Sequence, residues 1–154
     1  MSGRTVIRSG SIFEEQIGYV RAVVTGDLVF VSGCTGYDYQ TGTLPPNIIE
    51  QTEQCLRNVA KALEEAGASV DEIVRVRYIL SRREDFLLIW PVLRRWFSSS
   101  SSSSSSSGDD GDKDNRPTAT MFCAGLMNED MRIEIEVTAV KGSGSSRKGE
   151  RGCL

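Results

Sequence analysis

The sequence predicts an α+β fold in which six strands form one sheet and two helices cover one of its faces. Apolar and charged residues alternate strictly over residues 132–140, which is typical of a strand with one buried face. Apolar residues recur at helical spacing over residues 52–66. A chain of 154 residues with 39% hydrophobic and 25% charged residues is long enough for one domain with its own core.

The N-terminal part of the chain contains three predicted strands. Residues 5–8 are a short candidate edge strand. Two β-rich runs follow, residues 19–24 and 28–32, and Gly26 lies in the short turn between them. This order predicts two neighbouring antiparallel strands with a third at the edge of the sheet.

The first predicted helix follows a turn-rich loop, residues 36–46. Asn47 is a good N-cap, and Glu50 stands three residues later as its capping-box partner. Gly67 suits the position after the last helical turn, because glycine adopts left-handed backbone without a steric penalty. The signals together predict a helix over residues 47–66.

A strand and a second helix come next. Residues 73–80 are rich in β-branched residues, and their alternation places Arg75 and Arg77 on one side. An apolar helical pattern then continues over residues 81–97. Pro91 conflicts with a continuous helix, because proline lacks the N–H that the preceding turn needs. Either the helix kinks there, or it begins near Pro91 after a distorted turn.

The last two predicted strands are residues 118–125 and 132–140, separated by the short polar break 126–130. Their closeness in the sequence predicts a hairpin. Glu134 and Glu136 share the polar face of the second strand. The simple interpretation is a face in contact with solvent, and the alternative is a pair of functional carboxylates.

Two segments are predicted to be disordered. Residues 98–107 are an unbroken run of serine, and the Gly/Asp-rich residues that follow extend this insertion to 98–115. Residues 142–154 form a polar tail of similar composition. We therefore expect one domain, residues 1–141, interrupted by the insertion.

The predicted sheet has apolar residues on both faces, at odd and even positions alike, over residues 19–24 and 118–125. Two helices can cover only one face. A second apolar face is stable only when it is buried against a further surface. The simplest partner is another copy of the chain, so the pattern favours an oligomer.

The composition excludes several classes of function. The chain has no histidine, which excludes Ser-His-Asp and Cys-His catalysis and any histidine-bound metal. Its four cysteines form no CxxC pair. A net charge of −3 disfavours a nucleic-acid partner. No apolar run approaches the ~20 residues that span a bilayer, and no secretory signal is seen, so we expect a cytoplasmic protein without membrane contact, cofactor or metal.

Several segments carry a resemblance to a known family. They are IGYVRAVVTGDLVFVSG, EEAGASVDEIVRVRYIL, RREDFLLIWPVLRRWF and RPTATMFCAGLMNEDMRIEIEVTAV. The chain resembles the Rid family, the reactive intermediate deaminases, also called the YjgF or L-PSP endoribonuclease family. The resemblance implies a chorismate-mutase-like (YjgF-like) fold with a six-stranded mixed sheet, assembled as a homotrimer. It also implies a cleft for a small-molecule ligand at each subunit interface.

The resemblance also implies site residues. Glu134 matches the carboxylate that orients water in the active deaminases, and Tyr19 matches a tyrosine of the cleft. Ser32 and Gly33 match the serine-glycine pair at a strand end. We expect Glu134 and Tyr19 to be catalytic and the other two to bind substrate.

The family's carboxylate-binding arginine is not matched, because its place falls on Ala119, which offers no donor. Trp90 stands where the family often has a small polar residue, which predicts a more apolar site. Arg116 or Arg21 are the cations considered as replacements. Ala119, Trp90 and Arg116 complete the expected substrate-binding residues.

Three functions remain open from the sequence. The first is an enamine/imine deaminase with an altered substrate, in which Glu134 activates water. The second is a non-catalytic protein that binds a metabolite in the same clefts. The third is an endoribonuclease or translation inhibitor, which the absence of histidine and the negative charge disfavour.

Overall fold

A computed structural model describes residues 3–98 and 114–144 of the chain. Most of the predicted insertion 98–115 and of the predicted tail 142–154 lies outside these residues. The described elements, in chain order, are β1 (Arg4–Ile7), α1 (Ile12–Ile17), β2 (Ala22–Thr25), β3 (Leu28–Thr35), α2 (Ile48–Glu65), β4 (Ile73–Leu80), α3 (Trp90–Phe97), β5 (Thr118–Cys123) and β6 (Ile133–Val140). Short 3₁₀ turns precede β4 and α3, at Val70–Glu72 and Arg83–Asp85.

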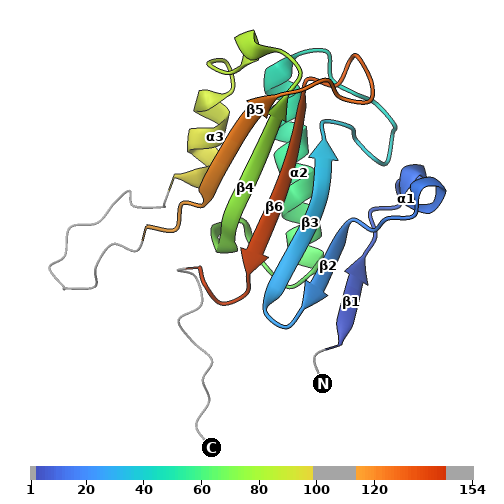
Figure 1. The fold of residues 1–154 in the computed structure, drawn as a ribbon, viewed down its shortest axis with the longest axis vertical. Coiled ribbons are helices and arrows are strands. Elements are labelled where there is room, and N and C mark those ends of the chain that lie inside the picture. The colour runs from blue at the N-terminus through green and yellow to red at the C-terminus, as the bar shows by residue number, and fades with distance from the viewer. Residues whose placement is uncertain (1–2, 99–113, 145–154) are drawn as a thin grey trace, which may run out of the picture.

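All six strands belong to one mixed sheet with the order β1-β2-β3-β6-β4-β5 (Figure 1). The four neighbouring pairs β1-β2, β2-β3, β3-β6 and β6-β4 are antiparallel, whereas β4 and β5 run parallel. The six-stranded α+β fold predicted from the sequence is confirmed.

The predicted hairpin of the last two strands is wrong. β6 lies between β3 and β4, and β5 is at the edge of the sheet beyond β4. The apolar residues of β6 are almost completely buried, which is the environment of a central strand. The polar segment between the two strands therefore crosses the end of β4 instead of forming a tight turn.

The N-cap and C-terminal signals of α2 are confirmed, and the structure shows which of the two alternatives at Pro91 holds for α3. The Asn47 side chain accepts a hydrogen bond from the Glu50 N–H at 2.9 Å, and Gly67 has a φ of 76°. Pro91 lies in the first turn of α3, where its missing N–H costs nothing. The helix thus begins next to the proline, after a 3₁₀ turn, and does not kink around it.

The structure contains a third α-helix, α1, that the sequence analysis did not predict. It has only six residues, too few for a clear apolar period. The Ser11 side chain caps its first turn, and Gly18 ends it with a φ of 84°. The helix places Glu14 close to the start of β2, which matters for the site below.

The core lies between the sheet and α2, which crosses behind β3, β6 and β4 in Figure 1. The α2 side chains in this layer include Leu56, Val59 and Leu63, each at most 1% exposed. α3 is joined to α2 by a hydrogen bond of 3.0 Å from the Trp96 indole N–H to Glu53. These contacts leave the other face of the sheet uncovered by α2.

We call that other face the open face. Residues opposite one another in paired strands share a face, so the register shows on which face of the sheet each side chain lies. Glu134 pairs with Ile79 and Thr35 and lies on the open face. Phe30, at 42% exposed, and Phe122, at 43%, add large apolar side chains to it. The mixture of apolar and charged residues predicted for this face is therefore present.

Candidate functional site

A groove of about 380 Å³ lies on the open face, across β2, β3, β6 and β4. Two of the residues singled out in the sequence, Tyr19 and Ser32, line it. Arg4, Arg75 and Glu136 supply its charges. Its apolar wall includes Val23, Val31 and Phe30, so the groove presents a few polar groups beside an apolar surface.

β3 contains a β-bulge where it borders this groove, at Ser32. Val31 pairs with Val137 and Cys34 pairs with Ile135, so the two residues between them on β3 face a single residue of β6. Those two residues are Ser32 and Gly33. The bulge turns this strand end out of the regular ladder and brings its backbone against the β6 carboxylates.

The side chain of Ser32 is held by the preceding loop. Its hydroxyl donates a hydrogen bond of 2.7 Å to the Val20 carbonyl. Its N–H donates to the Arg21 carbonyl at 2.9 Å. Because the hydroxyl proton is used, the serine oxygen can only accept from a ligand in the groove.

Glu134 packs directly on Gly33. A Cβ added at Gly33 would lie 1.9 Å from the Glu134 Oε1 atom, so only glycine leaves room for this carboxylate. Burial raises the pKa of the Glu134 carboxyl above its usual value; the positive charge of Arg21 opposes this shift, and the neighbouring Glu136 adds to it. A half-buried carboxyl with a raised pKa is suited to accept a proton from water.

Two arginines on β4 share the open face with these carboxylates. Arg77 forms an ion pair of 3.3 Å with Glu136. Arg75 donates a hydrogen bond of 3.3 Å to the Thr138 hydroxyl and lines the groove. The guanidinium of Arg75 is therefore the β4 cation placed to meet an anionic ligand in the groove.

The two replacement cations considered from the sequence are engaged elsewhere. Arg116 is exposed and forms an ion pair with Asp114. Arg21 is buried, pairs with Glu14 and donates to the Tyr19 hydroxyl at 3.2 Å. Neither guanidinium faces the groove as a free carboxylate clamp.

The remaining expected residues lie apart from Tyr19 within one chain. Trp90 begins α3 and makes an edge-to-face contact with Phe86, with ring centroids 5.2 Å apart. Ala119 pairs with Val76, whose side chain points toward the helix layer. Ala119 and Glu134 thus occupy opposite faces of the sheet. The structure of one chain brings together Tyr19, Ser32, Gly33 and Glu134, but not Trp90, Ala119 or Arg116.

Sequence reasoning missed Arg4, Arg75 and Glu136 as lining residues. The alternation of residues 73–80 had already separated Arg75 and Arg77 from the apolar side of their strand. What it could not give was the strand order, which places β4 beside β6 and so brings Arg75 next to Thr138. That order depends on pairing between residues far apart in the sequence.

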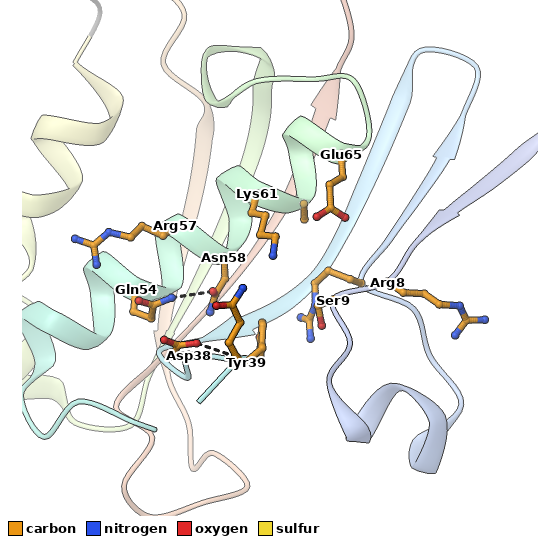
Figure 2. A pocket seen from close by; sticks show the side chains of 12 residues that line it. Arg8, Ser9, Asp38, Tyr39, Gln54, Arg57, Asn58, Lys61 and Glu65 are labelled. Atoms are coloured by element: carbon orange, nitrogen blue, oxygen red, sulfur yellow. Dashed lines mark hydrogen bonds between the residues drawn. The ribbon is translucent and has the colours of Figure 1, made fainter. Parts of the chain in front are cut away.

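A second cavity of about 210 Å³ lies on the other side of the molecule, between α2 and the loop at Asp38–Gln40 (Figure 2). Figure 2 shows Lys61 directed toward this loop and Tyr39 at its edge. Asp38 accepts hydrogen bonds from two N–H groups of its own loop, the nearer at 2.8 Å, so its carboxylate stabilises the turn. None of the expected site residues lines this cavity.

Neither a metal-binding cluster nor a membrane-spanning helix is found among the described residues. Residues 3–98 and 114–144 contain no group of three or more histidine, cysteine or acidic side chains that could hold a metal ion. Within the same residues, no helix combines the length and apolar character needed to cross a membrane.

Comparisons with known proteins agree with the fold. The sequence model of the family described as "Endoribonuclease L-PSP" matches residues 11–141. A goat (Capra hircus) protein named "2-iminobutanoate/2-iminopropanoate deaminase" is 26% identical over 125 residues, covering 80% of each chain. A "RutC family protein" of Haemophilus influenzae is 28% identical over 123 residues, covering 80% of this chain and 86% of the relative.

Solved structures show the same relationship. The crystal structure of Rv2704 from Mycobacterium tuberculosis, described as a member of the YjgF/YER057c/UK114 family, has a TM-score of 0.73 and 30% identity. It covers 90% of this chain and 99% of its own. The shared fold therefore extends over nearly the whole domain.

Proposed function

The chain belongs to the Endoribonuclease L-PSP family, also known as the YjgF or Rid family, and we propose that it hydrolyses a small imine to a carbonyl compound and ammonia. The observation that carries this proposal is the Glu134 carboxyl, which has a raised pKa and packs against Gly33, the neighbour of the groove residue Ser32. The relative from goat, whose name describes a 2-imino acid deaminase, supports the same class of reaction.

The proposed chemistry needs a base and a donor. The imine nitrogen is protonated at the start, and Glu134 accepts a proton as water adds to the carbon of this iminium ion, which gives a carbon bearing both a hydroxyl and an amino group. Glu134 returns that proton to the nitrogen, the C–N bond breaks, and ammonia leaves as the hydroxyl loses its proton to become the carbonyl. Tyr19 donates a hydrogen bond to the reacting groups, and the oxygen of Ser32 accepts one from them.

The substrate is proposed to differ from the usual small imino acids of the family. Ala119 offers no donor where active members have a carboxylate-binding arginine, so a different cation must hold an acid group. Arg75 lies in the groove and is the candidate, with Arg4 on the far side. Phe30 and Val23 would contact an apolar substituent.

We propose that the site is completed at the interfaces of a homotrimer. Ala119 and Glu134 face opposite sides of their own sheet, so they can meet only when they come from different copies. In this assembly α2 and α3 form the outer layer and the open faces form the inner one. The half-exposed Leu28, Phe30 and Phe122 of the open face would be buried there.

A second function is favoured by one observation. The absence of a donor at Ala119 removes a contact worth about 1.5–3 kcal/mol when the partner is charged. A protein that binds a metabolite in the same groove without catalysis would not require that contact in the transition state. An endoribonuclease has no such support, since the chain contains no histidine and carries a net charge of −3.

The test is ammonia release from a series of 2-imino acids generated in solution. Purified wild type is compared with Glu134→Gln and with Glu50→Gln, an exposed glutamate on α2 that serves as the control. Activity that Glu134→Gln lowers at least about 100-fold supports the hydrolase. Binding without turnover, with Glu134→Gln equal to wild type, supports the metabolite-binding function. Sedimentation at micromolar concentration tests the trimer, and a monomer would overturn it.

A further inference from the structure

Arg21 lies behind the groove and is almost completely buried, at 2% exposed. Its guanidinium donates to the Gly33 carbonyl at 2.8 Å and to the Tyr19 hydroxyl at 3.2 Å. Both acceptors belong to the proposed site. One buried side chain therefore contacts the groove residue Tyr19 and the backbone on which Glu134 packs.

The direction of these hydrogen bonds has a chemical consequence. A guanidinium can only donate, so the Tyr19 oxygen accepts the bond from Arg21. The tyrosine O–H proton must then point away from Arg21 and remains available as a donor. The same guanidinium fixes the carbonyl of Gly33, the residue on which Glu134 packs.

Two tyrosine rings lie within cation–π distance of the guanidinium. The Arg21 carbon lies 4.8 Å from the ring centroid of Tyr39 and 5.6 Å from that of Tyr19. Tyr39 and Arg21 both line the second cavity, whose edge at Tyr39 is seen in Figure 2. Both stacking contacts restrict the direction in which the N–H groups point.

Glu14 supplies the charge that balances Arg21. Its carboxylate lies 3.5 Å from the Arg21 Nε, and both side chains are buried, at 2% and 3% exposed. Glu14 also accepts hydrogen bonds from the Ser9 N–H at 3.1 and 3.2 Å. Burial raises the pKa of Cys34 and of Tyr39, so these neighbours stay neutral and do not compete for the guanidinium charge.

Stability alone does not account for this arrangement. Removing two charges from water costs several kcal/mol for each ion, and apolar side chains of similar size often stabilise a core equally well. The pair does, however, direct two hydrogen bonds to fixed acceptors, the Gly33 carbonyl and the Tyr19 hydroxyl, which apolar side chains cannot do.

We propose that Arg21, balanced by Glu14, is the positioning residue of the groove: it orients the Tyr19 hydroxyl toward the substrate and fixes the Gly33 backbone that supports Glu134. The inference rests on the proposed function for its effect on turnover. Its structural part concerns only the orientation of Tyr19 and can be measured without a substrate.

The test uses the double variant Glu14→Gln/Arg21→Gln, which removes both charges and leaves no unpaired ion in the core. The matched control is Asp85→Asn/Arg132→Gln, a second ion pair with a hydrogen bond of 2.9 Å, in which Asp85 is buried and Arg132 half-buried and neither residue lines the groove. Thermal melting of both variants shows that they are folded and compares their loss of stability.

The structural readout is the NMR signal of tyrosine labelled with ¹³C at Cζ. The chain has four tyrosines, and Tyr19→Phe identifies the Tyr19 signal by its disappearance. We expect this signal to shift in Glu14→Gln/Arg21→Gln and to stay at the wild-type position in the control. An unchanged Tyr19 signal in a folded double variant would overturn the inference.

The kinetic readout is a double-mutant cycle with Tyr19→Phe. We expect Glu14→Gln/Arg21→Gln to lower kcat roughly tenfold with a smaller change in KM, and the control to stay within about twofold. In the Tyr19→Phe background most of this loss should be absent, because the two changes act through one hydroxyl. An equal loss in both backgrounds would overturn the inference. If wild type has no activity, the proposed function fails, and the tyrosine signal alone decides the role of Arg21.

Discussion

Glu134 and Gly33 occupy complementary spaces: the carboxylate of Glu134 fills the volume that a Cβ at Gly33 would need, with only 1.9 Å between the two positions. The bulge in β3 creates this contact by placing Ser32 and Gly33 opposite one residue of β6. The backbone at Gly33 does not need a positive φ, so its importance is the space beside Glu134 and not an unusual conformation. A single added methyl group therefore tests the carboxylate's position.

Gly33→Ala should displace Glu134 without unfolding the domain. The clash is with the far end of a flexible side chain, which can move, but the carboxylate would leave its place beside the groove. A shift of about 1 Å in a catalytic group commonly costs about 100-fold in rate. We expect a loss of that order in kcat/KM for imine hydrolysis and a small change in melting temperature. Gly125→Ala, where nothing lies within 4 Å of the new Cβ, is the control. Full activity in Gly33→Ala would contradict the proposed role of Glu134.

Glu134→Gln should change how stability depends on pH. Burial raises the pKa of Glu134 in the folded protein, so the folded chain binds this proton more tightly than the unfolded chain does. Wild-type stability should therefore fall as the pH rises from the usual glutamate range through the raised pKa. Glutamine does not titrate, so the variant should gain stability relative to wild type across this interval and keep that gain at higher pH.

The measurement is urea unfolding of both proteins between about pH 4 and pH 8, a range that spans the usual glutamate pKa and a raised one. Glu50→Gln is again the control, because this exposed residue lies at the solvent-facing start of α2. A stability difference that stays constant over the whole range, or that grows toward low pH, would show that Glu134 is not desolvated as the structure indicates.

The local elements of this fold could be predicted from the sequence because their signals are local. The Asn47 cap and the residues of α2 are confirmed, as is the alternation that gives the buried face of β6. The pairing of the strands could not be predicted in this way. β5 and β6 are close in the sequence, yet β4 lies between them, because the apolar face of β6 is buried most completely in the centre of the sheet.

The candidate site likewise contains residues that could be expected from the sequence and residues that only the strand pairing reveals. Tyr19, Ser32, Gly33 and Glu134 were expected from a resemblance. In a single chain Tyr19 and Ser32 line the groove, and Glu134 packs on Gly33, which follows Ser32 in the chain. Arg75 was missed because its nearness to the groove follows from the pairing of β4 with β6, which no local pattern encodes. Glu14 was missed because it lies on α1, a helix too short to produce an apolar period.

Arg75→Gln should weaken the binding of acidic substrates selectively. Arg75 is exposed and has one polar contact of 3.3 Å, to Thr138, so its guanidinium is available to a ligand in the groove. A hydrogen bond to a charged group is worth about 1.5–3 kcal/mol, and solvent exposure favours the lower end, or roughly tenfold in kcat/KM. Arg94→Gln, on the exposed side of α3, is the control.

The selectivity of that loss is measured with a pair of substrates, an imino acid and its neutral amide. The amide should be hydrolysed by Arg75→Gln and by wild type at similar rates, since it has no carboxylate to bind. Equal losses for both substrates would show that Arg75 supports the groove structurally and does not recognise the acid.

Ala119→Arg should create a carboxylate clamp at the position where active members of the family have one. Within one chain Ala119 faces away from Glu134, so the new guanidinium can act only at a neighbouring copy's groove. Even a partly formed pair of charge-assisted hydrogen bonds is worth over ~1.4 kcal/mol. We therefore expect a roughly tenfold or greater rise in the hydrolysis of 2-iminopropanoate-type substrates, provided that the variant forms the proposed trimer.

Two further variants test whether such a gain depends on the position of the new arginine and on Glu134. Ile49→Arg adds the same charge at an exposed position of α2, the outer layer of the proposed trimer, and it should not reproduce the gain. Glu134→Gln combined with Ala119→Arg should remove most of the gain, because an amide cannot accept a proton from water. Sedimentation of each variant separates a failed clamp from a lost assembly. If Ala119→Arg forms a trimer and gains no activity, that outcome favours the metabolite-binding function, since the cation expected to bind a small imino acid has then been supplied.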